Sequence, residues 1–350
     1  MNERPAGLWP SPEREAAFHA WAQGLRQPAG LAWETLAPAS ADASFRRYLR
    51  VQGEGGSSFI VMDAPPALED VRPFVHVAGL AQAAGLHVPR VLAADEGQGF
   101  LLLDDLGREL YIDALRDPAR ADALMRDALQ ALLRWQQGVP ASTLPAFDEA
   151  VLREELALFP EWCVQREFGI TWTARQQQAW QQLCDRLVAS ALAQPVVAVH
   201  RDWMPRNLMA CPGRNPGLLD FQDAAAGPLT YDLASLLRDA FLSWDEAQEL
   251  DWAVRWWQQA RGTGLLGEAF EADFGEFWRA LEWMGLQRHL RIMGIFCRLK
   301  QRDGKPRYTE DLPRFFGYAT RVALRYAPLK PLLALLEPMS GQAVGRGFTF

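Results

Sequence analysis

The sequence predicts an α+β fold of two lobes, a small β-rich N-terminal lobe and a large, mainly helical C-terminal lobe. Short β-type runs bounded by Gly, Pro and Ser dominate about the first hundred residues, and long helical patterns follow Asp117. Only two short apolar runs interrupt those helices. We therefore expect an N-terminal lobe in residues 1–103, a hinge in 104–110, a C-terminal lobe in 111–339 and a flexible tail in 340–350.

The N-terminal lobe should consist of strands, a helix and further strands. A Ser-Pro start and apolar residues at helical spacing predict a first helix over 13–27. Three antiparallel strands are expected within 33–38, 43–53 and 58–66, then an amphipathic helix over 71–85. Two more strands, joined by a Gly-containing turn, are expected within 88–107.

The C-terminal lobe should be helical except for two strands. The apolar run at 195–200 reads as a buried strand, and a shorter strand follows at 217–221. Helices are expected over residues 118–138, 147–166, 174–194, 231–242, 245–262, 274–300 and 312–328. Two lobes of this kind leave a cleft in which a ligand can bind.

Composition and charge narrow the class of protein. Hydrophobic residues make up 49% of the 350 residues and charged residues 23%, which is typical of soluble globular proteins, and a net charge of −7 argues against a nucleic-acid surface. The start of the chain lacks an apolar signal region and no window reaches the ~18 apolar residues of a membrane span. We expect a cytoplasmic monomer without a nucleic-acid or membrane partner. The four scattered cysteines predict reduced, buried thiols and no structural metal.

One sequence motif contains residues suited to catalysis. The apolar run 196–199 ends in His200, Arg201 and Asp202, with Asn207 five positions after Asp202 and Asp220 at the end of the next short strand. Phosphoryl transfer from a nucleotide needs a carboxylate near the attacking hydroxyl and oxygen ligands for Mg²⁺, and kinases supply them as H-R-D-x-x-x-x-N and a later Asp. The combination of loop, spacing and strand-delivered Asp indicates a phosphotransfer site that uses ATP and Mg²⁺.

The segments VHRDWMPRNLM, LLDFQDAAAGPLTYDLASLLRD and GFLLLDDLG resemble the aminoglycoside phosphotransferase-like small-molecule kinases, a branch of the protein-kinase-like fold. The resemblance extends from Ala39 to Tyr326. It implies that Asp202 is the catalytic base, that Asn207 and Asp220 bind Mg²⁺, and that His200 and Asp232 support the loop. Only a few residues separate Asp223 from the next helix, which leaves no room for a peptide-binding activation segment.

A closer resemblance is carried by ADASFRRYLRV, by the segment from Phe59 to Asp95 and by GFLLLDDLG. These segments are similar to the bacterial N-acetylmuramate/N-acetylglucosamine anomeric kinases, the AmgK family of peptidoglycan (cell-wall) recycling. The resemblance implies ATP-dependent phosphorylation of the C1 hydroxyl of an amino sugar. An anomeric hydroxyl is more acidic than an ordinary alcohol, so a carboxylate is an adequate base for it.

The N-terminal lobe departs from the kinase pattern because residues 1–299 contain no lysine. The third strand offers Met62 and Asp63 where kinases place a phosphate-binding Lys. An Arg can take that role, and Arg46, Arg47 and Arg50 are the candidates. The alternative is that each Arg only covers neighbouring strand residues. Other residues expected to contact ATP are Ser44 and Phe45 before the second strand, and Leu103, Asp105 and Leu106 at the hinge, where Asp105 could instead cap the next helix.

The helix that begins after Glu69 and Asp70 corresponds to the helix that carries the Glu partner of the kinase Lys. Pairing of one of these carboxylates with an Arg is possible, and capping of the helix is the simpler interpretation.

The acceptor site is predicted from position alone. Trp203 lies inside the catalytic loop, and aromatic rings pack on the C–H faces of sugars. A muramic acid also carries a lactyl carboxylate, for which Arg206, Arg288, Arg291 and Arg298 are available cations; Arg206 ranks first and Arg288 second. The residues proposed to bind the substrate are Trp203, Arg206, Asp223 and Arg288.

Two alternatives stay open. The protein could phosphorylate another small alcohol, such as an aminoglycoside, choline or homoserine. The missing lysine could instead indicate a nucleotide-binding pseudokinase module, although a degenerate site should lose its metal ligands first, and Asp202, Asn207 and Asp220 are all present.

Overall fold

The computed structural model describes residues 8–25, 30–39 and 45–347, without the side chains of 342–347. The chain forms two compact units. Residues 1–139 and 206–223 make up one, here called the sheet unit, and residues 140–205 and 224–350 make up the other, here called the helical unit. The lobe boundaries at residues 103 and 111 that the sequence predicts stay a prediction.

The sheet unit contains a five-stranded antiparallel sheet in the order β1-β2-β3-β5-β4. Its strands are β1 (Ala32–Pro38), β2 (Arg47–Gln52), β3 (Ser58–Asp63), β4 (Val91–Asp95) and β5 (Phe100–Asp104). All five lie where the sequence predicts strands, because their β-branched and aromatic runs end in Gly, Pro or Asp.

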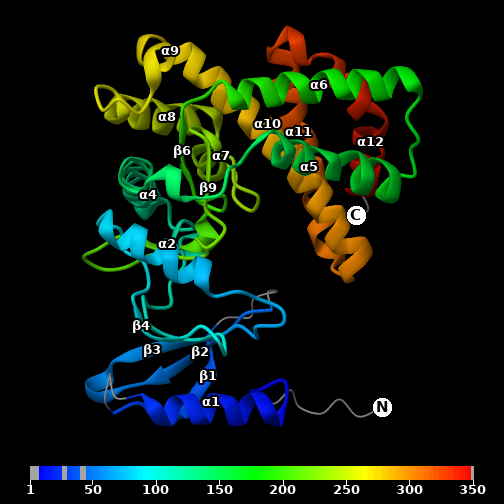
Figure 1. Cartoon of the computed structure of the whole chain (residues 1–350). Helices are drawn as coiled ribbons and strands as arrows, with labels where there is room; N and C mark the ends of the chain where they lie inside the picture. The colour runs from blue at the N-terminus through cyan, green and yellow to red at the C-terminus, as the bar shows by residue number, and fades with distance from the viewer. Residues whose placement is uncertain (1–7, 26–29, 40–44, 348–350) are drawn as a thin grey trace. The chain divides into compact units, whose positions relative to one another are not determined.

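The helix α1 (Pro12–Gly24) runs along one face of this sheet (Figure 1). Ser11 caps it by accepting a hydrogen bond from the backbone N–H of Arg14. Phe18 of α1 is fully buried against Val61 and Phe100 of the sheet, in one core cluster. Because side chains alternate along a strand, this cluster assigns one set of β2 and β3 residues to the α1 face.

Three helices and a short hairpin complete the sheet unit. The helices are α2 (Arg72–Ala83), α3 (Tyr111–Ala114) and α4 (Pro118–Gly138). The hairpin pairs β7 (Leu208–Met209) with β8 (Gly217–Leu218). Leu218 N–H donates to the carbonyl of His87 at 2.7 Å, and the Asn215 amide donates to the Tyr111 hydroxyl at 2.6 Å. These bonds attach the hairpin to the loop after α2 and to α3, and so fix the residues that flank it.

The helical unit is built around the 30-residue helix α10, which packs against α5, α6, α7 and α11 (Figure 1). Its helices are α5 (Glu149–Leu158), α6 (Ala174–Leu192), α7 (Tyr231–Leu237), α8 (Glu246–Ala260), α9 (Gly267–Ala272), α10 (Phe274–Asp303), α11 (Leu312–Arg325) and α12 (Pro331–Gly347). The strands β6 (Val196–Val199) and β9 (Ala225–Pro228) form an antiparallel pair. Gly304, with φ +66°, ends α10 in the left-handed conformation.

Several details differ from the helices that the sequence predicts. The helix expected over 147–166 is α-helical only to Leu158 and continues as the π-helix η3 (Phe159–Glu167), because Pro160 lacks the N–H that an α-helix needs there. The helix α12 continues to Gly347, through most of the segment expected to be a tail; the flexibility of residues 340–350 stays a prediction. All four cysteines are buried free thiols, as predicted. In the described part of the chain, no helix combines the length and apolar character needed to cross a membrane.

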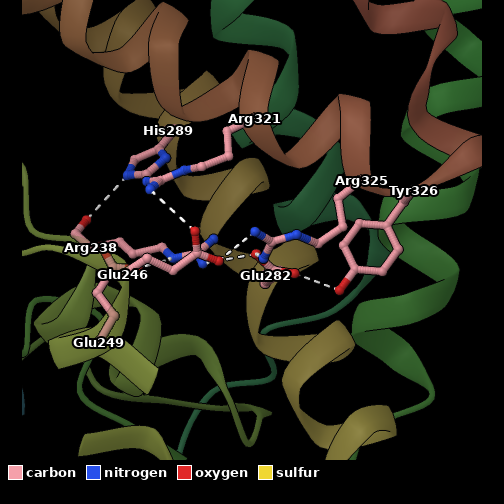
Figure 2. A network of polar contacts seen from close by, with 8 residues as sticks. All are labelled: Arg238, Glu246, Glu249, Glu282, His289, Arg321, Arg325 and Tyr326. Carbon is pink, nitrogen blue, oxygen red and sulfur yellow. Dashed lines mark hydrogen bonds and ion pairs between the residues drawn. The ribbon is translucent and has the colours of Figure 1, made fainter. Parts of the chain in front are cut away.

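A buried ion network joins four helices of this unit (Figure 2). Arg238, which follows α7, pairs with Glu249 of α8 at 3.2 Å and with Glu282 of α10 at 3.0 Å. Glu282 also accepts hydrogen bonds from Arg325 at 2.6 Å and from the Tyr326 hydroxyl at 2.5 Å. Burial alone would raise the pKa of Glu282, but these partners outweigh burial and lower it. The network fixes the rotation of α10 relative to α7.

Candidate active site

The predicted catalytic loop follows β6 in the helical unit, and Asp232 in the first turn of α7 holds its start. The Asp232 carboxylate accepts the backbone N–H of His200 at 2.6 Å and that of Arg201 at 3.0 Å. Asp232 is fully buried, and burial raises its pKa to about 7 against the opposing effect of the two backbone donors and Arg288. His200 Nδ1 accepts the backbone N–H of Asp202 at 3.3 Å. These contacts agree with the support role predicted for His200 and Asp232, which stays a prediction.

Backbone strain marks this loop and the end of the β7–β8 hairpin. Within the described residues, Arg201 (φ +76°) and Asp220 (φ +61°) are the non-glycine residues in the left-handed region. This conformation costs on the order of 1 kcal/mol or more for a residue with a Cβ, so the surroundings must enforce it. Both residues belong to the motif that the sequence singles out. Strain of this kind concentrates at functional sites.

Glu155 of α5 contacts Arg201 and two other polar side chains around it. Its carboxylate lies 3.5 Å from Arg201 Nη2, 3.1 Å from Arg291 Nε and 3.3 Å from the Tyr231 hydroxyl. Arg288 donates to the Arg201 carbonyl at 3.2 Å and to the Ser235 hydroxyl at 2.7 Å, and its guanidinium lies over the Tyr231 ring. Charged and polar side chains of α5, α7 and α10 therefore contact the loop at Arg201.

The two predicted metal ligands lie together in the sheet unit. Asn207 is the last residue of the 3₁₀ turn before β7, Asp220 follows β8, and Asn207 Nδ2 is 3.4 Å from Asp220 Oδ2. Leu219 N–H donates to the Asn207 carbonyl at 2.9 Å, which keeps these two segments paired. Amide and carboxylate oxygens are hard ligands that suit Mg²⁺. No cluster of three or more His, Cys, Asp or Glu side chains suited to a metal occurs in the described residues, so this site would need oxygen ligands from a substrate as well.

Gln222 is a member of this group that sequence reasoning missed. Its amide donates to Asp220 at 2.8 Å and to Asp223 at 3.3 Å. The amide thus bridges a predicted metal ligand and a predicted substrate residue, and its place between these two carboxylates in the quoted motif is the signal that could have found it. Glu155 was missed for a different reason: it lies 46 residues before Arg201, and only the fold brings the two together.

The three arginines expected near ATP phosphates have different surroundings. Arg46 pairs with Glu69, just before α2, at 2.9 Å between Nη2 and Oε2. Asp70 accepts the backbone N–H of Arg72 at the first residue of α2 and also pairs with the Arg72 guanidinium, while the N-cap Val71 has no side-chain capping bond. Pairing with an Arg therefore occurs at both carboxylates.

Arg47 and Arg50 form ion pairs with buried carboxylates. Arg47 pairs with Asp63, which also binds Arg14 of α1 at 2.6 Å. Arg50 donates to both oxygens of Asp105, at 2.5 and 3.0 Å. Among the three candidates, Arg46 is the one whose partner lies at the start of α2.

The hinge residues have mixed environments. Asp105 also accepts the Ser58 hydroxyl at 2.6 Å and the Gly107 N–H at 3.0 Å. Burial opposes ionisation of Asp105, but its bonds to Arg50 and Ser58 outweigh burial and lower its pKa. Leu103 is buried in β5, and the Leu106 carbonyl accepts the Cys211 thiol at 3.2 Å. Phe45 is 64% exposed, and Ser44 lies outside the described residues. Their roles toward ATP stay predictions.

The predicted substrate residues fall into two groups. Trp203 is fully buried, edge-on against His200, and Arg288 is 3% exposed and donates to Arg201 and Ser235 inside the unit. Arg206 and Asp223 are exposed. Contact of any of the four with a sugar stays a prediction, and burial favours a supporting role for Trp203 and Arg288.

Comparison with known proteins identifies a family. The model of the phosphotransferase enzyme family (APH) matches residues 35–281. A protein of Pseudomonas aeruginosa named N-acetylmuramate/N-acetylglucosamine kinase is 53% identical over 304 residues, which cover 87% of this chain and 88% of that protein. Proteins with the same name in Neisseria meningitidis and Caulobacter vibrioides are 47% and 33% identical, covering 89% and 79% of this chain and 93% and 84% of their own lengths.

Solved structures share the fold at low sequence identity. The ADP-bound aminoglycoside phosphotransferase APH(2'')-Ib has a TM-score of 0.57 at 12% identity, covering 89% of this chain and 99% of its own. The choline kinase LicA of Streptococcus pneumoniae has a TM-score of 0.58 at 10% identity, covering 91% and 99%. These likenesses confirm the predicted protein-kinase-like α+β fold.

Proposed function

Because this chain belongs to the phosphotransferase enzyme family (APH), we propose that it is an ATP-dependent sugar kinase that phosphorylates the C1 hydroxyl of N-acetylmuramate and N-acetylglucosamine. The substrate class is supported by relatives of that name at 47% to 53% identity over most of the chain. A role in cell-wall recycling, a cytoplasmic location and a monomeric state are parts of the same proposal.

The observation that carries the proposal is the fixed catalytic loop. Two backbone hydrogen bonds from His200 and Arg201 to Asp232 hold the residues just before Asp202 in place. A carboxylate on such a loop can serve as the base for a hydroxyl acceptor because its position does not depend on the substrate.

In the proposed reaction the Asp202 carboxylate accepts the proton of the C1 hydroxyl. The sugar oxygen forms a bond to the γ-phosphorus of ATP, and the bond from that phosphorus to the ADP oxygen breaks, with its electron pair leaving on ADP. Asn207 and Asp220 would hold Mg²⁺, which supplies positive charge to the phosphate oxygens. Arg46, oriented by Glu69, is the proposed phosphate ligand in place of the kinase Lys.

A substrate panel tests the proposal. We expect release of ADP with N-acetylmuramate and N-acetylglucosamine, and none above background with an aminoglycoside, choline or homoserine. Asp202→Asn keeps the size of the side chain but removes the base, so turnover should fall by about 10²-fold or more. Turnover that is unchanged in Asp202→Asn would overturn the catalytic role and favour a nucleotide-binding module.

A further inference from the structure

Arg291 lies on α10 beside the catalytic loop, at a position that the sequence did not rank first. Its Nε is 3.1 Å from Glu155 Oε1, and 17% of its side chain is exposed. Glu155 also contacts Arg201, the residue before Asp202. The chain of contacts from Arg291 through Glu155 to Arg201 lies entirely within the helical unit.

Arg291 also interacts electrostatically with the catalytic carboxylate. Burial alone would lower the pKa of Arg291, but the interactions with Tyr231, Glu155 and Asp202 outweigh it and raise the pKa. The guanidinium is therefore charged, and Glu155 links it to Arg201, the residue before Asp202.

The two arginines of α10 next to the loop use their donors differently. Arg288 donates one hydrogen bond to the Arg201 carbonyl and one to the Ser235 hydroxyl, and it is 3% exposed. Within the described residues, Arg291 has a single ion pair, to Glu155, and its side chain is partly open to solvent. A guanidinium carries five N–H donors in a fixed fork that matches a carboxylate. The partly open side chain of Arg291 can therefore be reached by a ligand more readily than the closed side chain of Arg288.

The ion network fixes α10, the helix that carries Arg291, against its neighbours (Figure 2), and Glu155 pairs with the guanidinium itself. Glu282 and His289, on the same helix, contact Arg238, through a 3.0 Å ion pair and a 3.2 Å contact to its carbonyl. These contacts are fixed within the interior and do not depend on a bound substrate. A preorganised cation loses little entropy when it binds a carboxylate.

The two sugars of the proposed function differ at one charged group. N-acetylmuramate carries a lactyl ether with a carboxylate at C3, where N-acetylglucosamine has a hydroxyl. A carboxylate brought close to Asp202 is repelled unless a cation compensates it. We propose that Arg291 binds the lactyl carboxylate and is the residue that selects the acidic sugar. This inference rests on the proposed function and deepens it.

The test is a ratio of specificity constants. For wild type, Arg291→Gln and Arg291→Lys, kcat/KM is measured with N-acetylmuramate and with two neutral acceptors, N-acetylglucosamine and the amide of N-acetylmuramate. The ratio of acidic to neutral kcat/KM should fall about 10- to 100-fold in Arg291→Gln, the value of one charge-assisted hydrogen-bonded contact, and less in Arg291→Lys. Because both constants come from one preparation, the ratio does not depend on the folded fraction.

A matched variant on the same helix is the control. Arg298→Gln makes the same change two turns further along α10 and should leave the ratio at the wild-type value. An unchanged ratio in Arg291→Gln and Arg291→Lys, or an equal fall in Arg298→Gln, would overturn this inference and leave the proposed function intact. A wild-type protein that phosphorylates none of these acceptors would overturn the proposed function itself.

Discussion

The Oδ2 atom of Asp232 lies 2.6 Å from the backbone nitrogen of His200, which attaches the catalytic loop to the first turn of α7. A second bond, from Arg201 N–H, uses the other carboxylate oxygen. Each carboxylate oxygen therefore satisfies a backbone donor of the loop, and the left-handed Arg201 is held between them and the Arg288 side chain.

Replacing Asp232 by Asn should loosen the loop. The amide has one acceptor oxygen, so one of the two backbone N–H groups loses its partner at a cost of about 1–3 kcal/mol in the free energy of unfolding. We expect kcat to fall about 10- to 100-fold with both sugars, measured by ADP release. Asp148→Asn, which keeps the helix cap of α5, is the matched control and should leave kcat and stability unchanged. Full activity in Asp232→Asn would contradict the support role.

Asp232 should also make stability depend on pH. Its pKa is about 7 in the folded protein against 3.8 for the ordinary carboxyl, so between these values the folded state binds a proton that the unfolded state has released. Stability from this group is therefore present at low pH and lost as pH rises through about 7. Urea unfolding at pH 5.5 and pH 8 should show a larger decrease for wild type than for Asp232→Asn, by about 1–2 kcal/mol. Equal decreases would show that Asp232 is ionised throughout.

A substitution in the buried part of the ion network should lower the free energy of unfolding far more than a substitution at its exposed edge. Glu282→Gln leaves Arg238, Arg325 and Tyr326 without their shared carboxylate, and loss of one partner of a buried pair costs about 3–5 kcal/mol. Glu246→Gln removes a partly exposed partner of Arg325 and Arg321 and should cost less than about 1 kcal/mol. Chemical denaturation of both variants measures the two values. Similar losses would mean that the interior of the network is already solvated.

Replacement of Arg46 should weaken the binding of the nucleotide and not that of the sugar. If it binds phosphate in place of the kinase Lys, Arg46→Ala should raise the KM for ATP about tenfold or more and leave the KM for either sugar within about twofold, since it removes one charge-assisted contact. Arg46→Lys should recover part of the loss. Arg72→Ala, which removes the exposed Arg72–Asp70 pair nearby, should change neither constant. An Arg46→Ala enzyme with the wild-type KM for ATP would contradict this role for Arg46 and favour Arg47 or Arg50 as the phosphate ligand.

The sequence predicted the strands around the proposed catalytic loop well because their pattern is local. The spacing of Asp202, Asn207 and Asp220, and the strands before and after them, can be read from adjacent residues, and the structure has strands β6 and β8 in those places. Helix α4 likewise begins and ends at the predicted residues, since Pro118 follows the Asp117 cap and Gly138 closes the pattern.

Burial and long-range pairing could not be predicted in the same way. Trp203 and Arg288 were assigned to the substrate by position, but only the packing of α7 and α10 shows how deeply both are buried. Glu155 lies 46 residues before Arg201, and nothing in its local sequence indicates a charged partner. Arg46 and Glu69 are 23 residues apart in the sequence, so their ion pair was only one of two alternatives until the structure was known.

The measurement that tests the central claim most directly is the phosphorus NMR spectrum of the product. Incubation of the protein with MgATP and N-acetylmuramate or N-acetylglucosamine should give the signal of a sugar 1-phosphate that disappears on mild acid treatment, and the signal should be absent with Asp202→Asn. An acid-stable 6-phosphate, or no sugar phosphate at all, would contradict the account.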